Sequence, residues 1–202
     1  MSVGDAGRQH ELVIRAASRR GDVDVRVVGG YKEIRPSAFR AARAVCLAAP
    51  SMCSWDESPW PRARLLQELE RADLCAVAVP LVAAIPAKLG IGITTIIEVV
   101  ARGVPLLTLD YPHLKHYLVH GCNAHLVPPP AADASPAQQQ EWLTSRYRAG
   151  FDALVEPSRR SRLQECAEQH AGNFTAEAVS RALNATLDAR SWRWSEAEGA
   201  GQ

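Results

Sequence analysis

Lys88, Gly90, Gly92, Thr94 and Glu98 lie close together in the stretch KLGIGITTIIE. Glycines directly before a helix let an anion approach the backbone N–H groups, and the partial positive charge of a helix N-terminus favours phosphate there. A lysine adds a point charge, and a carboxylate one turn into the helix can accept hydrogen bonds from a sugar diol. These residue types therefore fit a ligand that joins a diphosphate to a sugar diol, as a nucleotide sugar does.

The same residues also have a plain structural interpretation. Glycines often serve only tight turns, and a glutamate on a surface helix is usually a solvated charge. A GxG pattern alone is a weak signal for a ligand. The stretch by itself therefore leaves ligand binding and local structure as equal alternatives.

The apolar residues of this stretch predict a helix over residues 93–102. Four of them repeat at helical spacing and are expected to face a sheet: Ile93, Ile96, Ile97 and Val100. Thr94 and Glu98 then lie one turn apart on a neighbouring stripe. Gly103 predicts a left-handed helix end, and Pro105 prevents continuation of the helix.

Strand-like and helix-like segments alternate along the chain. Helical spacing of apolar residues occurs in residues 8–20 and 62–72. Strand-like runs occur in residues 22–30, 73–82 and 104–110. Residues 44–50 (AVCLAAP) are predicted as a further short strand, and residues 51–61 (SMCSWDESPWP) as a loop. Because a strand–helix–strand order needs a parallel sheet covered by helices, we expect an α/β fold with a Rossmann-like, doubly wound parallel sheet.

Length and composition indicate a single domain. The 202 residues, of which 47% are hydrophobic and 22% charged, match one globular core. An exposed connector is expected at residues 126–140, followed by segments of helical propensity. We assign residues 1–190 to a nucleotide-sugar-binding domain and residues 191–202 to a flexible tail.

The net charge of +1 gives no general attraction to nucleic acid or to an anionic membrane. A local cluster of Arg159, Arg160 and Arg162 has two interpretations, a solvated helix face or a peripheral contact with a membrane surface. The sequence contains neither an apolar run long enough to span a bilayer nor the pattern of a signal peptide. We therefore expect a cytoplasmic protein.

The cysteines and histidines are also assigned structural roles. Five cysteines, an odd number with no CxxC pair, suggest neither a disulfide framework nor a zinc site, so we expect reduced and mostly buried thiols. Four histidines crowd into one stretch: His113, His116, His120 and His125. A metal site is one interpretation, but no nearby carboxylate or thiol completes a ligand set, so a polar connector is favoured and no metal is predicted.

Several segments of the chain together resemble the C-terminal, donor-binding half of the GT-B glycosyltransferases of the retaining family called group 1. Residues 88–110 are similar to that family's run of a basic residue, GxGI, threonine, glutamate and GxPVV. Residues 120–129 (HGCNAHLVPP) are similar to its dGvNGxLVPP element, and residues 173–175 (NFT) to its rFSW motif. Similar segments at residues 2–17 and 71–80 extend the resemblance over nearly the whole chain.

The resemblance implies a donor site. The predicted donor-binding residues are Arg8, Gly29, Gly30, Lys88, Gly90, Gly92, Ile93, Thr94 and Glu98. Glu98 would bind the donor ribose, Lys88 and Arg8 would neutralise phosphate charge, and the residues between Gly90 and Thr94 would offer backbone and hydroxyl groups to the diphosphate. No metal and no cofactor other than the nucleotide-sugar donor is expected, and no catalytic residue is assigned.

The sequence departs from the family pattern at three positions. Gly90 stands eight residues before Glu98, where the family has a carboxylate that often contacts the donor sugar. Asp5 replaces an arginine and Thr95 a lysine, so phosphate binding is expected to be weaker. Residues 51–61 replace a short connection before the base-binding loop, which leaves the identity of the base open.

The implied function is transfer of a hexose from a nucleotide-diphosphate sugar to an acceptor hydroxyl, in polysaccharide or glycoconjugate biosynthesis. A GT-B enzyme has two Rossmann-like domains with the reaction in the cleft between them, and nothing in this sequence can be the acceptor domain. We therefore expect either a piece of a longer enzyme or a chain that works with a separate acceptor-binding domain or subunit. The isolated chain is expected to be inactive.

Two other functions stay open. A non-catalytic module that binds a nucleotide or nucleotide sugar and scaffolds a partner is supported by Gly90 in place of the carboxylate. A dinucleotide oxidoreductase is weaker, because the glycine pattern after residue 2 is partial and its acidic ribose ligand is ambiguous between Asp22 and Asp24. Three tryptophans are expected to pack against helices or a missing domain rather than against sugars: Trp142, Trp192 and Trp194.

Overall fold

The computed structural model describes residues 2–3, 10–18, 20, 22–28, 36–56, 61–78 and 93–174. Within them six strands form one parallel sheet: β1 (Ser2–Val3), β2 (Val25–Val28), β3 (Cys53–Asp56), β4 (Cys75–Val77), β5 (Leu106–Leu109) and β6 (Ala124–Val127). Their order across the sheet is β3-β2-β1-β4-β5-β6. This order reverses between β1 and β4, as in a doubly wound Rossmann sheet. The predicted fold class is therefore confirmed.

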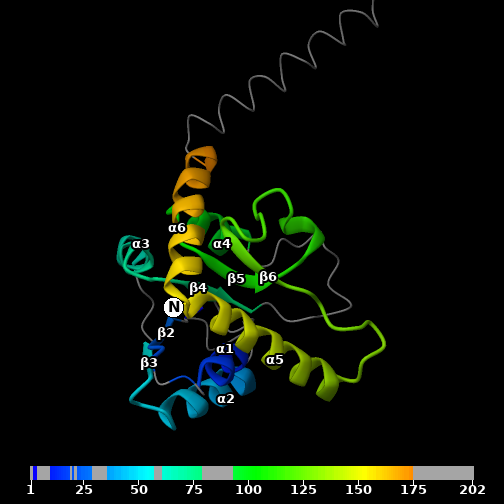
Figure 1. Ribbon diagram of the computed structural model, residues 1–202. Helices are drawn as coiled ribbons and strands as arrows, with labels where there is room; N and C mark the ends of the chain where they lie inside the picture. The colour runs from blue at the N-terminus through cyan, green and yellow to red at the C-terminus, as the bar shows by residue number, and fades with distance from the viewer. Residues whose placement is uncertain are drawn as a thin grey trace, which may run out of the picture.

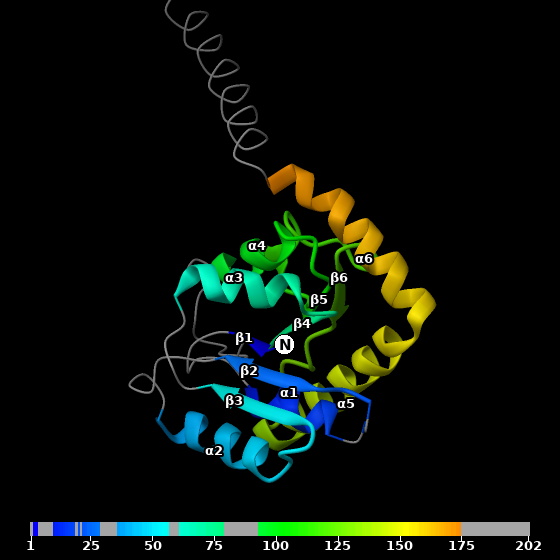
Figure 2. The same ribbon diagram turned by 90° about the vertical axis from the view of Figure 1, so that its left-hand side faces the viewer.

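Helices cover both faces of this sheet (Figures 1 and 2). They are α1 (His10–Ala17), α2 (Pro36–Leu47), α3 (Arg62–Glu70), α4 (Ile93–Val100), α5 (Pro136–Val155) and α6 (Pro157–Ala171). Figure 2 shows α1, α2 and α5 on one side of the sheet and α3 and α4 on the other. Helix α6 continues from the end of α5 and contacts α4, so the last long helix joins the two layers.

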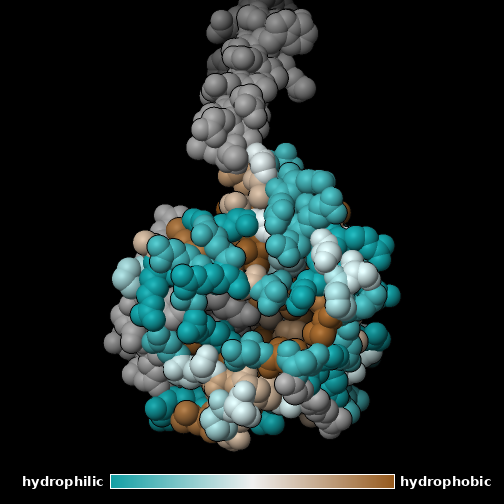
Figure 3. Space-filling model, turned by 60° about the vertical axis from the view of Figure 1, so that its left-hand side comes forward, coloured by the Kyte–Doolittle hydropathy of each residue, from teal (hydrophilic) through white to brown (hydrophobic). Residues whose placement is uncertain are grey.

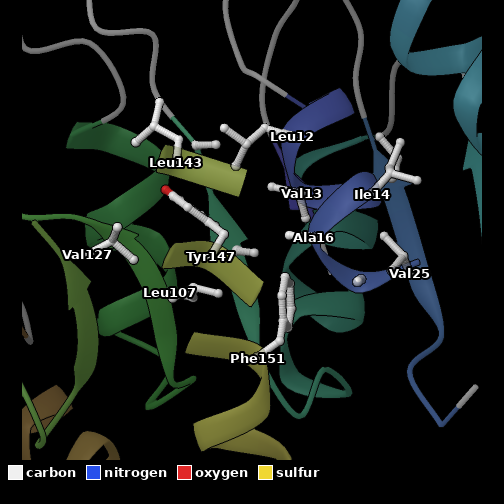
Figure 4. Packing of buried hydrophobic residues seen from close by; sticks show 14 of the residues in the cluster. Leu12, Val13, Ile14, Ala16, Val25, Leu107, Val127, Leu143, Tyr147 and Phe151 are labelled. Atoms are coloured by element: carbon white, nitrogen blue, oxygen red, sulfur yellow. The ribbon is translucent and has the colours of Figure 1, made fainter. Parts of the chain in front are cut away.

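The strands alternate their side chains between two apolar cores. In β5, Leu107 and Leu109 belong to the core beneath α1 and α5, whereas Leu106 belongs to the core beneath α3 and α4. All four residues of β5 are buried, so this strand is covered on both faces, and the prediction of a strand within residues 104–110 is confirmed. Figure 4 shows the first core, in which side chains of α1 such as Leu12 and Val13 meet Tyr147 and Phe151 of α5.

The structure corrects two predictions in the first half of the chain. Residues 44–47 of the predicted strand AVCLAAP form the last turn of α2, because Ala42 and Cys46, four residues apart, give one buried helical stripe. The segment predicted as a loop contains strand β3 instead. This strand lies at the edge of the sheet, where only Cys53 is fully buried and the other three residues are partly or fully exposed. Its polar composition therefore resembles that of a loop.

The connector predicted at residues 126–140 is shorter than expected. Val127 still belongs to β6, and helix α5 begins at Pro136. Ser135 caps the helix: its side chain accepts a hydrogen bond from the Gln138 backbone N–H, and the Gln138 side chain accepts one from the Ser135 N–H. This reciprocal capping box is a helix-start signal that the proline-rich composition conceals.

Gly103 ends α4 as predicted. Its φ angle is +67°, in the left-handed region that favours glycine. A Cβ atom at this position would lie 2.9 Å from the Cα atom of Glu168 in α6. Glycine therefore serves both the helix end and the close approach of α6 to the end of α4.

The expectation of reduced cysteines is wrong for four of the five. Cys46 is bonded to Cys53, and Cys122 is bonded to Cys166, while Cys75 is buried and forms no disulfide bond. The first bond ties the end of α2 to β3, and the second ties the turn before β6 to α6. Sequence spacing alone does not reveal either pair, because no CxxC pattern marks them.

None of the described helices has the length and apolar character needed to cross a bilayer. The predicted tail, residues 191–202, lies outside the described residues.

Candidate functional site

Three neighbouring strands end level with one another at one edge of the sheet. Val3 of β1 pairs with Val28 of β2, and Ser2 pairs with Ala76 of β4, one residue before the end of that strand. Because all three strands are parallel, these are their carboxyl ends. The order of the sheet reverses between β1 and β4, and ligands of this architecture bind at the carboxyl ends beside such a reversal.

Most of the predicted donor-binding residues follow these three strand ends in the sequence. Six lie in the connections after β1, β2 and β4, outside the described residues: Arg8, Gly29, Gly30, Lys88, Gly90 and Gly92. The three chain segments that carry them all leave the sheet at this one edge, because the three strands are parallel. The described strand ends are therefore compatible with a common site, while the six residues themselves lie outside the described part of the chain.

Helix α4 carries the remaining predicted residues. Ile93 and Thr94 form its first turn, and Glu98 follows one turn later and is partly buried. Because Thr94 and Glu98 are four residues apart, they occupy the same face of the helix. Both positions lie in the first two turns of α4, and their role in donor binding stays a prediction.

The predicted buried stripe of α4 is wrong at one position. Ile96, Val99 and Val100 are fully buried, whereas Ile97 is only partly buried. The sequence ITTIIEVV is apolar around most of the helix, so its pattern does not define a single face.

A buried pair of hydroxyl groups contacts the end of β4. The Thr108 hydroxyl of β5 donates to the Val77 carbonyl oxygen at 2.8 Å, and the Tyr147 hydroxyl of α5 donates to the same oxygen at 2.9 Å. Both side chains are completely buried, and Figure 4 shows the Tyr147 ring among the apolar side chains of α1 and α5. Sequence analysis missed this contact, because Val77 is 31 residues from Thr108 and 70 from Tyr147. The hydroxyls fix the last residue of the strand that precedes the predicted diphosphate-binding segment.

Two further residues at this edge were not assigned a role from sequence. Asp110 and Tyr111 directly follow β5, and the Asp110 N–H donates to the Val127 carbonyl at 2.8 Å. Tyr111 packs against both apolar cores, and burial raises the pKa of its phenol to about 12. The phenol therefore stays protonated at neutral pH. In the sequence, Asp110 and Tyr111 follow directly after an apolar run of strand length, and this position was the signal that could have indicated a place at this edge.

The histidine-rich stretch forms a small cluster beside β6. The rings of His120 and His125 lie 5.1 Å apart, and the His120 Nδ1 atom accepts a hydrogen bond from the Leu126 N–H at 2.9 Å. Burial, with smaller contributions from the charges of His120 and Arg159, lowers the pKa of His125. In the described part of the chain, no three His, Cys, Asp or Glu side chains gather in a way that could hold a metal ion.

A separate hollow of about 480 Å³ opens at the opposite edge of the sheet. Its lining includes Val25 at the start of β2 and Leu74 just before β4, together with Phe151 and Leu154 of α5. Figure 3 shows this hollow with an apolar floor and a hydrophilic rim. It lies at the amino ends of the strands, so it is distinct from the candidate site at their carboxyl ends.

Solved structures share this architecture. The C-terminal domain of a glycosyl transferase group 1 family protein (LpcC) from Francisella tularensis is 14% identical, with a TM-score of 0.62 over 85% of this chain and 83% of that domain. Anabaena Alr3699/HepE, solved with UDP and glucose, is 17% identical with a TM-score of 0.64 over 93% of this chain. The pneumococcal O-GlcNAc transferase GtfA, solved with UDP and GlcNAc, is 17% identical with a TM-score of 0.60 over 88% of this chain.

This likeness confirms the Rossmann-like fold, which the chain shares with the C-terminal domain of LpcC and with parts of the longer neighbours. The chain spans 31% of the GtfA chain and 48% of the Alr3699/HepE chain, so it covers only part of the longer neighbours. Comparison with protein-family models gives no match. Comparison with curated protein sequences gives none either.

Proposed function

We propose that this chain is the donor-binding half of a glycosyltransferase that moves a hexose from a nucleotide-diphosphate sugar to an acceptor hydroxyl. The observation that carries the proposal is the level ending of β1, β2 and β4 at the edge where α4 begins. Every predicted donor-binding residue lies either in α4 or in a connection that leaves this edge. The solved neighbours with UDP and a sugar have the same fold, which supports the choice of ligand.

In this proposal the protein stabilises the leaving nucleotide diphosphate without a metal ion. The first turn of α4, from Ile93, would present backbone N–H groups and the positive end of the helix dipole to the phosphates. Lys88 and Arg8 would add positive charge, and Glu98 would accept hydrogen bonds from the ribose hydroxyls. Negative charge that develops on the leaving group would thereby be stabilised, which is a large contribution in group transfer.

A complete catalytic cleft needs a second half that binds the acceptor. We infer that this half is supplied by a further domain or by a separate subunit, because the described residues build a single sheet. The acceptor and the stereochemical outcome follow from that assembly.

Cellular location and membrane contact stay predictions. Two members of the arginine cluster pair with carboxylates, Arg159 with Glu156 at 3.1 Å and Arg160 with Asp73 at 3.6 Å, which leaves less free charge for an anionic membrane. The two disulfides bear against the predicted cytoplasmic location, since such bonds are rare in a reducing compartment. Trapping free thiols at the moment of cell lysis would decide between reduced and bonded cysteines.

Calorimetric titration of the chain with UDP, GDP and ADP tests the donor site. We expect saturable binding of one nucleotide and a loss of ~10- to 100-fold in affinity for Glu98→Gln, since a hydrogen bond to a charged group contributes ~1.5–3 kcal/mol. Glu165→Gln, which changes an exposed glutamate of α6, is the matched control and should bind normally. If none of the three nucleotides binds, or if the two variants bind with equal affinity, the donor site is rejected.

A non-catalytic scaffold is the second candidate, and Gly90 in place of a sugar-contacting carboxylate favours it. The two candidate functions predict different results for a Glu98 variant of the complete assembly. The transferase predicts that Glu98→Ala abolishes sugar transfer, whereas the scaffold predicts that the activity of the partner persists.

A further inference from the structure

We propose that Trp142 and Asp133 form a subsite for a sugar of the acceptor glycan. This inference rests on the proposed function, because it names the class of acceptor that the transferase would use. Trp142 lies in the second turn of α5, and its side chain is 37% exposed, while its neighbour Leu143 is 2% exposed. This inference departs from the sequence prediction that Trp142 packs against helices or a missing domain rather than against sugars.

Two contacts hold the Trp142 ring in one orientation. Its indole N–H donates a long hydrogen bond of 3.4 Å to the Pro128 carbonyl, just after β6. The guanidinium of Arg146 stacks on the ring, with 4.1 Å between its Cζ atom and the ring centroid. An aromatic ring held in this way loses little further conformational entropy when it binds a ligand.

The free part of the ring lines a hollow of about 450 Å³. The other residues around it are Pro130, Ala131, Asp133, Ala134 and Gln138. Gln138 lies four residues before Trp142 and Arg146 four residues after it, so the hollow and the guanidinium flank the ring from opposite ends. The indole therefore lines the hollow while the Arg146 guanidinium covers one of its faces.

The chemistry of the lining fits a saccharide. A pyranose ring presents C–H groups that pack on an aromatic face, and hydroxyl groups that need hydrogen-bond acceptors at its edge. Among the described residues Asp133 has no hydrogen bond or ion pair, and it is exposed. Its carboxylate can accept two such hydrogen bonds from sugar hydroxyls. A rigid apolar platform and a free carboxylate thus lie around one hollow.

The position of the hollow agrees with this role. It is built from the connection that leaves the carboxyl end of β6, at the same edge as the candidate donor site (Figure 1). Strand β6 is two places from β4 in the sheet, so the strands that lead to the hollow and to the donor site are about 10 Å apart. Reacting atoms approach within about 3–3.5 Å. The sugar on Trp142 is therefore a unit further along the glycan, and the ligand is an oligosaccharide rather than a single sugar.

NMR titration of the 15N-labelled chain tests the subsite. The probes are maltotriose, cellotriose and triacetylchitotriose, each beside its monosaccharide, with the indole N–H signal of Trp142 assigned from Trp142→Phe. We expect at least one trisaccharide to shift this signal saturably and its monosaccharide to bind at least tenfold more weakly. In calorimetry, Trp142→Ala should abolish binding and Asp133→Asn should weaken it about tenfold. Val119→Ala, which trims an exposed apolar side chain elsewhere, should bind as the unchanged chain does.

The outcomes separate this inference from the proposed function. If UDP, GDP or ADP binds but no trisaccharide shifts the Trp142 signal, the subsite is wrong and the donor site stands. If a trisaccharide binds at Trp142 but no nucleotide binds, the saccharide site stands and the donor assignment fails. Trisaccharide binding that Trp142→Ala leaves unchanged would also overturn the subsite.

Discussion

Replacement of Gly103 by alanine tests how α6 is held against the end of the candidate site helix. The backbone of Gly103 has a φ angle of +67°, which an alanine adopts at a cost of about 1–2 kcal/mol. The added Cβ would also meet the Glu168 Cα atom at 2.9 Å, and backbone cannot move aside as a side-chain tip can. Overpacking of this kind costs about 1–3 kcal/mol. We therefore expect the free energy of unfolding to fall by about 2–5 kcal/mol in total.

Two other glycines supply matched controls. Gly121 has a φ angle of +78° with no atom within 4 Å of an added Cβ, so Gly121→Ala should lose only the strain of about 1–2 kcal/mol. Gly172 has helical backbone angles and open space, so Gly172→Ala should be neutral or more stable by up to about 1 kcal/mol. Urea unfolding followed by circular dichroism measures all three variants. If Gly103→Ala is no less stable than Gly121→Ala, the close approach of α6 to α4 is incorrect.

Three further predictions concern stability. Tyr147→Phe keeps the buried ring but removes the hydrogen bond to the Val77 carbonyl, so chemical unfolding should show a loss of about 1 kcal/mol, and no loss would mean that the hydroxyl is not bonded there. Reduction of the Cys122–Cys166 bond, which spans 44 residues, should lower the free energy of unfolding by about 4 kcal/mol in a background in which Cys46, Cys53 and Cys75 are replaced by alanine, so that no other disulfide is reduced; an unchanged urea midpoint with dithiothreitol would contradict the bond. The folded state lowers the pKa of His125 below 6.5, so unfolding takes up a proton as pH falls through this value. Stability should therefore decline as pH falls through 6.5 toward the lower pKa of the folded state, and a slope that His125→Gln leaves unchanged would exclude His125 as its source.

The sequence predicted best those elements whose local residue pattern fits only one type of secondary structure. The apolar run around Leu106 and Leu107 fits only a strand buried on both faces. Gly103 and the proline two residues later mark the end of α4 without help from the rest of the fold. The parallel sheet then follows from the alternation of such elements.

The incorrect predictions share one cause, because each depends on how parts of the chain that are distant in sequence pack together. Strand β3 lies at the sheet edge, so its polar residues carry no strand pattern. The pairs Cys46–Cys53 and Cys122–Cys166 depend on which helix ends meet in space. Ile97 was assigned to the buried face because α4 is apolar around most of its circumference.

For the candidate site, too, some features could be predicted from the sequence and others needed the folded chain. Residue types at the start of α4 indicated the ligand class, and the resemblance indicated which connections should contribute. The contact of Tyr147 with Val77 and the exposure of Trp142 needed the folded chain, since each depends on how α5 lies against the sheet. Sequence therefore predicts which edge of the sheet binds the ligand, and the structure adds the buried contacts of α5 with the sheet beside that edge.

The most direct test of the central claim is amide NMR of the 15N-labelled chain during titration with UDP, GDP and ADP. For one nucleotide, the largest shifts should fall on Thr94 and Thr95 in the first turn of α4 and on Ala78 just after β4. Amides of Val25 and Leu74, which line the hollow at the opposite edge, should stay in place. Shifts centred on that opposite hollow, or none with any of the three nucleotides, would contradict a diphosphate site at the carboxyl ends of the strands.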